Sequence, residues 1–215
     1  MKQILIATTN PGKIATIKKI LAKLGFEGLS FADLNLSLDE PEETKLTAEE
    51  IAAEKALFYA EQYQDLPVLT RDDTNILFGV DEDDDPKNHN KAFVTRKKGE
   101  YTDEKGAEAF AEVAHKYGGS VPTRFDWGYA LAWHKDGETK VVSGLAYAGD
   151  DMLKIVDEIS PNKVPGYCMA PVLKVLVDGE WKYDSELKEE DNWKAYWKAQ
   201  SETIKKLIDQ CDLLK

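Results

Sequence analysis

The amino-acid sequence predicts a mixed α/β fold, and two observations lead to this prediction. In the first half, short apolar runs of strand length alternate with stretches whose apolar residues recur at helical spacing. In the second half, short apolar runs are joined by Asp-Gly dipeptides, which are typical of β-hairpin turns. Because alternating units favour parallel pairing and hairpins favour antiparallel pairing, we expect a mixed sheet rather than a purely parallel one.

The first strand and helix are the clearest elements. Residues 4–8 form a short apolar run that predicts a buried strand. Residues 9–13, which follow this strand, predict a polar loop that contains glycine. Isoleucines and leucines then recur at helical spacing from Ile14 to Leu24, and Gly25 is a plausible helix end.

The next elements are a loop, a helix and a second strand. Residues 34–41 show no period and indicate a loop. Thr47 and Glu50 form a capping box ahead of an Ala-rich helix at 51–63. Residues 66–70 then predict a short buried strand, and the acidic run at 81–85 indicates a solvated loop. The remaining predicted elements are a helix at 104–117, strands at 125–133 and 140–143, a short helix at 149–159, a hairpin of 172–177 and 181–183, and a last helix at 189–214.

Composition sets limits on the class of protein. With 215 residues, of which 42% are hydrophobic and 32% charged, the chain fits a globular protein of one domain or two fused lobes. No apolar run approaches the ~20 residues of a membrane-spanning helix, and the apolar start is too short for a secretory signal. The only cysteines, Cys168 and Cys211, are too few for a disulfide scaffold, so we expect a cytoplasmic location.

The net charge of −12 argues against binding to a nucleic-acid backbone, because such binding is driven by cationic side chains that release counterions. A polyanionic small substrate would need a local cluster of lysine, arginine or metal inside the acidic surface.

The loop after the first strand is one candidate site. A strand-to-helix loop presents backbone N–H groups and the positive end of the helix dipole, to which Thr8, Thr9 and Asn10 add neutral donors. Lys13 adds a point charge that can reach a phosphate. The pattern is not a Walker loop, and an ordinary turn with a surface lysine is the alternative.

A second candidate is the pair Asp72 and Asp73 at the end of a short buried strand. Adjacent carboxylates at such a position can hold Mg²⁺ and orient a water, and each raises the pKa of the other. The alternative is a turn aspartate next to a helix-capping aspartate. The acidic stretch that ends at Glu43 reads as a solvated loop unless the fold brings it beside Asp73.

Two further cations are candidates for phosphate binding. Lys55 lies on the Ala-rich helix, and the positions three and four residues away hold no acidic partner, which favours a functional role slightly. Arg96 could hold a phosphate through two parallel hydrogen bonds, although a solvated surface arginine is the simpler interpretation. The three histidines show no metal-ligand spacing, and no motif for a nucleophilic serine or cysteine is present.

Taken in order, these stretches resemble the motifs of the inosine/xanthosine triphosphate pyrophosphatases. Residues 4–13 are similar to that family's apolar strand followed by Thr-x-Asn-x-Gly-Lys, and residues 43–56 to its Glu-Thr-Gly-x-Thr-Phe-x-Glu-Asn-Ala-x-x-Lys-Ala. Residues 72–75 resemble its Asp-Asp-Ser-Gly, and residues 93–96 its Tyr-Ser-Ala-Arg. The likeness is strong over residues 4–96, and four motifs in one order are far more specific than any single one.

The resemblance implies a single domain over residues 1–215: an elongated, twisted mixed β-sheet in two lobes with flanking helices and a central cleft. It also implies a homodimer and Mg²⁺-dependent hydrolysis, with Mn²⁺ as an alternative, of a non-standard purine nucleoside triphosphate to monophosphate and pyrophosphate, which cleanses the nucleotide pool. The implied metal ligands are Glu43, Asp72 and Asp73, and the implied catalytic residues are Asp73 and Lys13. The implied substrate-binding residues are Thr8, Thr9, Asn10, Lys13, Lys55, Arg96 and Tyr167.

The departures from the family lie at the end of the site that holds the base. The family's Phe-Gly-Tyr/Trp-Asp-Pro corresponds to residues 167–171, where only the leading aromatic survives, as Tyr167, and Ala170 replaces the aspartate. The family's purine-contacting Ser-His-Arg has no counterpart, so base discrimination is expected to change. Trp193, Tyr196 and Trp197 lie in that region and could stack on a base or pack the last helix. The alternatives are therefore a pyrophosphatase with changed base preference, a nucleotide-binding protein of weakened activity, and an unrelated α/β domain.

Overall fold

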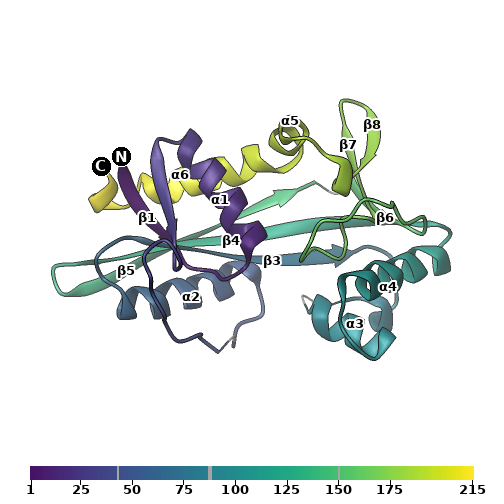
Figure 1. Cartoon of the computed structure of the whole chain (residues 1–215), viewed down its shortest axis with the longest axis horizontal. Coiled ribbons are helices and arrows are strands. Elements are labelled where there is room, and N and C mark those ends of the chain that lie inside the picture. Colours follow the sequence, from purple (N-terminus) through teal and green to yellow (C-terminus); the bar gives the residue numbers. More distant parts are fainter. Residues whose placement is uncertain (43, 87–88, 150) are drawn as a thin grey trace. The chain divides into compact units, whose positions relative to one another are not determined.

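The structure is a computed structural model that describes residues 1–42, 44–86, 89–149 and 151–215. Its strands form a mixed sheet in the order β2-β1-β3-β4-β6-β7-β8, with β5 paired to β4 (Figure 1). The predicted mixed α/β fold with flanking helices is confirmed. Contacts divide the chain into unit 1, made of Met1–Asp73, Asp126–Ala146 and Trp197–Lys215, and unit 2, made of Thr74–Phe125 and Tyr147–Tyr196.

Unit 1 contains the parallel part of the sheet. Strand β1 (Lys2–Ile6) pairs in parallel with β2 (Phe26–Ser30) and with the start of β3 (Val68–Leu77). Strand β4 (Ser120–Lys135) returns as β5 (Glu138–Ala148) through a two-residue turn. Both turn residues, Asp136 and Gly137, have positive φ angles of 53° and 83°, as the tight hairpin turn predicted from the Asp-Gly dipeptide requires.

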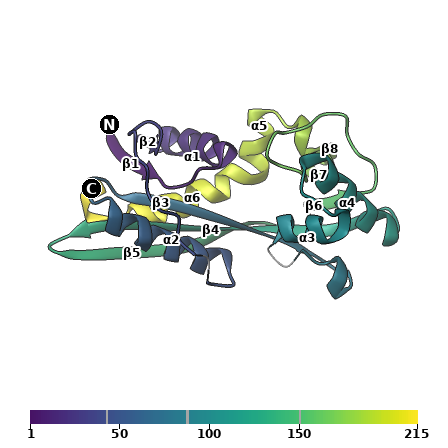
Figure 2. The same cartoon turned by 60° about the horizontal axis from the view of Figure 1, so that its bottom comes forward.

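The helices of unit 1 start where local capping groups allow. Helix α1 (Pro11–Lys23) is capped by the Asn10 side chain, and α2 (Ala48–Gln62) by the predicted Thr47–Glu50 capping box. The third helix is α6 (Lys198–Ile208), and a short turn, η4 (Asp212–Leu214), ends the chain. In Figures 1 and 2, α2 and α6 cover opposite faces of the β3–β4 strand pair.

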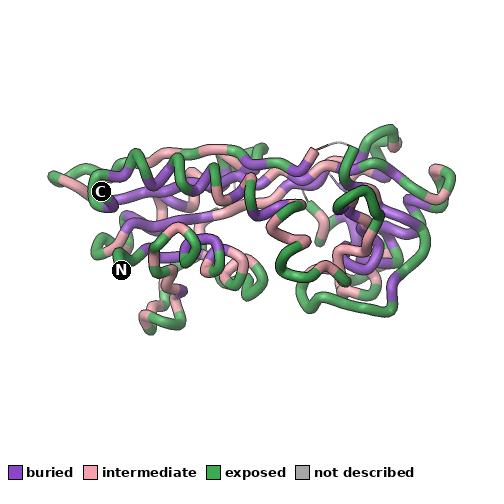
Figure 3. Tube along the Cα trace, turned by 90° about the horizontal axis from the view of Figure 1, so that it is seen from above, coloured by how far each residue is buried: buried purple, intermediate pink, exposed green. Residues whose placement is uncertain are grey.

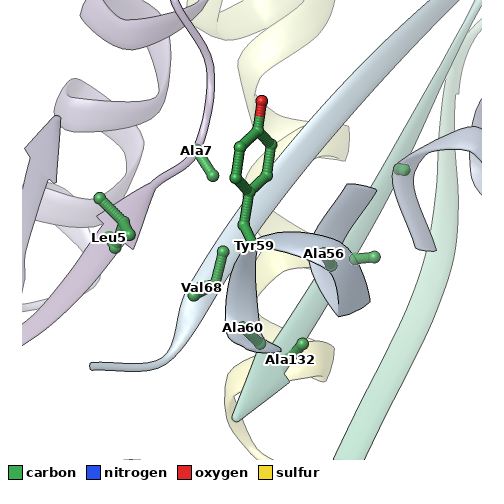
Figure 4. Close-up of a cluster of buried hydrophobic side chains, with 9 residues drawn as sticks. Leu5, Ala7, Ala56, Tyr59, Ala60, Val68 and Ala132 are labelled. Carbon is green, nitrogen blue, oxygen red and sulfur yellow. The ribbon is translucent and has the colours of Figure 1, made fainter. Parts of the chain in front are cut away.

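Small side chains allow α2 to lie close against the sheet of unit 1. The buried cluster between them contains five alanines from α2 and β4 beside Tyr59, with Leu5 and Val68 from the strands (Figure 4). Gly128 on β4 goes further, because a Cβ atom there would collide with the Ala48 backbone at the start of α2. The first turn of α2 therefore rests directly on the β4 backbone.

Unit 2 combines helices with antiparallel strands. Helices α3 (Asn90–Lys98) and α4 (Asp103–Lys116) pack through Phe93 and Phe110, whose ring centroids lie 5.2 Å apart. Its strands are β6 (Leu153–Val156), β7 (Leu173–Val177) and β8 (Glu180–Tyr183), and β6 pairs with the start of β4. The shorter pieces are η1 (Glu82–Asp84), η2 (Asp184–Glu186), α5 (Glu189–Asn192) and a π-helical turn (Trp193–Trp197). Figure 3 shows buried stretches along the strands and exposed outer faces on the helices.

Three local predictions need correction. The predicted helix at 149–159 is wrong: β6 lies there, because Leu153 and Ile155 are buried while Lys154 between them is not, which is a strand period. The acidic run at 81–85 is not wholly solvated, since Asp84 is buried. The last helix is interrupted by the π-helical turn, and neither β2 nor α3 was predicted.

Within the described residues, no helix is both long and apolar enough to cross a membrane.

Candidate active site

The candidate site of unit 1 lies where β3 runs on past its pairing with β1. Strand β1 pairs with Val68 and Leu69 of β3, and the acidic pair begins three residues after Leu69. At that position the N-terminus of α1 brings Lys13, and α2 brings Lys55. Three elements that are separate in sequence therefore meet at Asp72 and Asp73.

Both lysines approach Asp72 through the same carboxylate oxygen. Lys55 Nζ donates to Asp72 Oδ1 at 3.1 Å, and Lys13 Nζ lies 3.9 Å from that atom. Lys13 Nζ also lies 3.5 Å from Asp73 Oδ2 and within 3.5 Å of the Arg71 carbonyl oxygen. Strand β3 thus supplies an acidic partner for Lys55.

The Arg71 guanidinium donates two parallel hydrogen bonds to the Asp73 carboxylate. Its Nε donates to Oδ1 at 2.6 Å and its Nη2 to Oδ2 at 3.0 Å. Residues two apart on a strand share a face, which explains why these side chains meet. The guanidinium also lies 6.0 Å from the centroid of the Trp127 ring. The sequence motifs assign no role to Arg71, and its spacing of two residues from Asp73 on one strand is the signal that indicates one.

Cationic side chains surround the two aspartates. Those of Lys13, Lys55 and Arg71 lie within ion-pair distance of the Asp72 and Asp73 carboxylates. These five side chains are partly buried, with exposed fractions of 11–26%. A partly buried group of cationic side chains inside a chain of net charge −12 favours an anionic ligand.

The two aspartates differ in their protonation behaviour. Burial raises the pKa of Asp72 above its ordinary value, and the nearby Lys13 and Lys55 only partly offset this effect. Burial acts in the same direction on Asp73, but Arg71 and Lys13 together hold its pKa below the ordinary value. Asp73 is therefore the more firmly ionised member of the pair, and the expectation that neighbouring charge raises both pKa values holds only for Asp72.

Some polar groups of the loop before α1 form hydrogen bonds with the loop itself and with the first turn of the helix. Asn10 Oδ1 accepts hydrogen bonds from the backbone N–H groups of Gly12 and Lys13, at 2.9 and 3.1 Å. Thr8 Oγ1 accepts one from the Asn10 N–H at 3.3 Å, while Thr9 is exposed. Asn10 thus acts as a helix cap that fixes the direction of α1 and, with it, the position of Lys13.

The remaining predicted residues belong to unit 2 or are outside the description. Arg96 on α3 borders an open depression of ≈ 740 Å³, and its Nη2 donates to the Asp83 carbonyl oxygen at 3.0 Å. Tyr167 packs edge-on against Phe125 and borders a separate pocket of ≈ 190 Å³. Glu43 lies outside the described residues. Among the residues that are described, no group of three or more His, Cys, Asp or Glu side chains is arranged to hold a metal ion.

The aromatic residues near the last helix serve packing. Tyr196 is buried and its hydroxyl donates to Asp184 Oδ1 at 2.7 Å, while Trp197 is buried beneath Lys19. Of the two roles considered for them, helix packing therefore describes Tyr196 and Trp197. In the described part of β3 beyond Asp73, Thr74 Oγ1 and Asn75 Nδ2 are buried without a hydrogen-bond partner.

The chain is similar to known proteins in both sequence and structure. A model described as the Ham1 family matches residues 4–145. A dITP/XTP pyrophosphatase of Agrobacterium fabrum is 42% identical over 80 residues, which is 37% of this chain and 36% of that protein. One from Rhizobium meliloti is 45% identical over 71 residues, 33% of this chain and 32% of that protein. The matched stretch thus spans about a third of the length of these curated relatives.

Solved structures resemble nearly the whole chain. The Staphylococcus aureus Ham1 protein superposes with a TM-score of 0.62 at 23% identity and covers 96% of each chain. A HAM1 protein from Coxiella burnetii gives a TM-score of 0.66 at 20% identity and covers 98% of this chain and 100% of its own. At these identities the likeness concerns the fold.

Proposed function

The chain belongs to the Ham1 family, and on that premise we propose that it hydrolyses a nucleoside triphosphate to the monophosphate and pyrophosphate. The observation that supports this most is the cluster in which Lys13, Lys55 and Arg71 surround Asp72 and Asp73. Such a site combines cations that can bind a polyphosphate with carboxylates that can hold a metal ion and accept a proton.

Lys13 and Lys55 are the proposed phosphate ligands of unit 1. Each already neutralises a carboxylate, and each keeps a mobile ammonium group that can exchange that partner for a phosphate oxygen. Their exposed fractions of 20% and 18% leave access for a ligand while limiting competition from water. Arg96 is the proposed cation of unit 2, and Thr8, Thr9, Asn10 and Tyr167 complete the proposed contacts.

The donor set fits a hard divalent cation. Asp72 and Asp73 offer carboxylate oxygens, which are the ligands that Mg²⁺ and Mn²⁺ prefer, and no thiolate or imidazole belongs to the cluster. We propose that these two residues hold Mg²⁺, with Glu43 as a third ligand implied by the family motif. When bound, the ion would neutralise charge on the triphosphate and so lower the barrier to attack.

The protein's own groups account for the remaining chemistry. In the proposed reaction a water oxygen bonds to the α-phosphorus, the bond from that phosphorus to the bridging oxygen breaks, and pyrophosphate leaves. The Asp73 carboxylate orients the water and accepts its proton. The lysines hold the phosphate oxygens in line, which is the main protein contribution to such reactions.

The substrate class comes from the relatives. Those at 42% and 45% identity are named dITP/XTP pyrophosphatases, and we extend a preference for non-standard purine triphosphates to this chain, with a role in cleansing the nucleotide pool. The loss of the purine-contacting motifs favours a changed base preference within that class. A homodimer and a cytoplasmic location remain predictions.

A second candidate is a protein that binds the nucleotide without turnover. The observation that favours it is the bidentate hold of Arg71 on Asp73, which engages both oxygens of the proposed base. A panel of ribo- and deoxyribonucleoside triphosphates, including ITP, XTP and dITP, separates the two candidates when binding and pyrophosphate release are measured with Mg²⁺ and Mn²⁺. The first candidate predicts turnover of at least one substrate; micromolar binding with no product from any of them would support the second.

A further inference from the structure

Arg71 is placed to do more than balance charge. Its fork-shaped guanidinium takes both oxygens of Asp73, at 2.6 and 3.0 Å, and its side chain is only 11% exposed. Asp72 is engaged differently, because Lys13 and Lys55 both approach the single oxygen Oδ1. Of the two proposed metal ligands, Asp73 is therefore the one whose oxygens are both occupied by one cation.

A divalent ion that binds Asp73 has to displace Arg71 or share the carboxylate with it. Two cationic centres on one carboxylate repel each other, and in a partly buried site this repulsion is weakly screened. A triphosphate changes the balance, because a phosphate oxygen pair matches the guanidinium fork as well as a carboxylate does. The Trp127 ring, 6.0 Å from the guanidinium carbon, supports the cation without depending on Asp73.

We propose that Arg71 is a triphosphate ligand that holds Asp73 in the free protein and passes to phosphate when the metal–nucleotide complex binds. The arginine thereby couples the two ligands: metal binds weakly alone and tightly with nucleotide. Coupling of this kind is reciprocal, so the metal raises nucleotide affinity by the same factor. This inference rests on the proposed function, since it takes Asp73 as a metal ligand.

The test is a titration of the metal-free protein with Mn²⁺, followed by electron paramagnetic resonance, without nucleotide and with a triphosphate whose α–β bridge is a non-hydrolysable imido group. The variants are Arg71→Gln, which removes the charge and the fork, and Arg71→Lys, which keeps the charge and removes the fork. Lys18→Gln is the matched control, because Lys18 pairs with Asp33 in unit 1 and its loss changes the net charge equally. Asp73→Asn reports whether the ion binds at Asp73 at all.

We expect Arg71→Gln to bind Mn²⁺ alone at least about tenfold more tightly than the wild type, as removal of one charge within about 5 Å predicts. Its gain in Mn²⁺ affinity on adding the analogue should shrink correspondingly, Arg71→Lys should lie between, and Lys18→Gln should match the wild type. Unchanged or weaker Mn²⁺ binding by a folded Arg71→Gln, while Asp73→Asn loses it, would overturn the role of Arg71 and leave the metal site standing. Unchanged binding by Asp73→Asn would overturn the metal assignment and this inference together.

Discussion

Substitution of Asp84 by asparagine is a demanding test of the unit 2 structure. This carboxylate comes from the acidic run and is 5% exposed, yet it accepts hydrogen bonds from three side chains. Lys97 and Lys116 each donate at 2.6 Å, and the Tyr117 hydroxyl at 2.9 Å. The single side chain thus ties η1 to α3 and to the end of α4.

The expected cost follows from those contacts. Hydrogen bonds to a charged group contribute about 1.5–3 kcal/mol each, but Lys97 and Lys116 are 31% and 54% exposed and can regain water when released. Lys116 also keeps its bond to Asp81. We therefore expect a loss of about 2–3 kcal/mol in unfolding free energy, which for a chain of this size lowers the melting temperature by about 4–12 °C.

Thermal unfolding followed by circular dichroism measures this loss, with Asp81→Asn as control. Asp81 is exposed and shares Lys116, so its loss should change the melting temperature little. Burial opposes ionisation of Asp84, but the two lysines and the tyrosine hold its pKa well below the ordinary value. A lowered pKa stabilises the fold above the unfolded value, near 4, and this contribution is lost as the pH falls further. Equal melting temperatures for wild type and Asp84→Asn at pH 7 would show that the Asp84 carboxylate does not stabilise the fold.

Three other predictions concern packing and ionisation. Gly128→Ala should destabilise the protein by about 3 kcal/mol or more in urea unfolding, because the added Cβ collides with the Ala48 backbone; wild-type stability would contradict that packing. Burial raises the pKa of Asp184 to about 6. As the pH rises from 4 to 6, the unfolding free energy of the wild type should therefore fall relative to that of Asp184→Asn, by up to about 3 kcal/mol. A difference between the two proteins that does not change with pH would contradict this prediction. Both cysteines are buried, and burial raises the pKa of Cys168 to about 11. We therefore expect Cys168 and Cys211 to react with Ellman's reagent only after unfolding. Rapid labelling of the native protein would show that one of them is accessible.

Elements set by short-range chemistry were predictable from the sequence. The Thr47–Glu50 capping box and the Asp-Gly hairpin turns depend on residues a few positions apart, and the structure confirms them. The sequence predicts a helix in place of β6 because the Gly-Asp-Asp that precedes this strand resembles a helix start. Only the burial of Leu153 and Ile155 in the folded chain shows the two-residue period clearly.

In the candidate site, too, contacts between residues near in sequence are predictable, whereas contacts between separate elements are not. The sequence shows that no acidic residue lies three or four positions from Lys55, but its partner Asp72 comes from another element, 17 residues away. Arg71 belongs to none of the sequence motifs, although a cation two residues before Asp73 on one strand must share its face. The burial of Asp84 could not be predicted, because a run of acids indicates only charge and the lysines that cover it come from α3 and α4.

We propose that the cluster around Asp73 cleaves the bond between the α- and β-phosphates. The most direct measurement is quantitation of monophosphate and pyrophosphate formed from the preferred triphosphate by the wild type and by Asp73→Asn. We predict equal amounts of both products from the wild type and a rate loss of at least about 100-fold in the variant, the scale expected when a catalytic proton acceptor is removed. Release of nucleoside diphosphate and inorganic phosphate would contradict cleavage at the α-phosphorus, and full activity of Asp73→Asn would contradict the proposed role of Asp73.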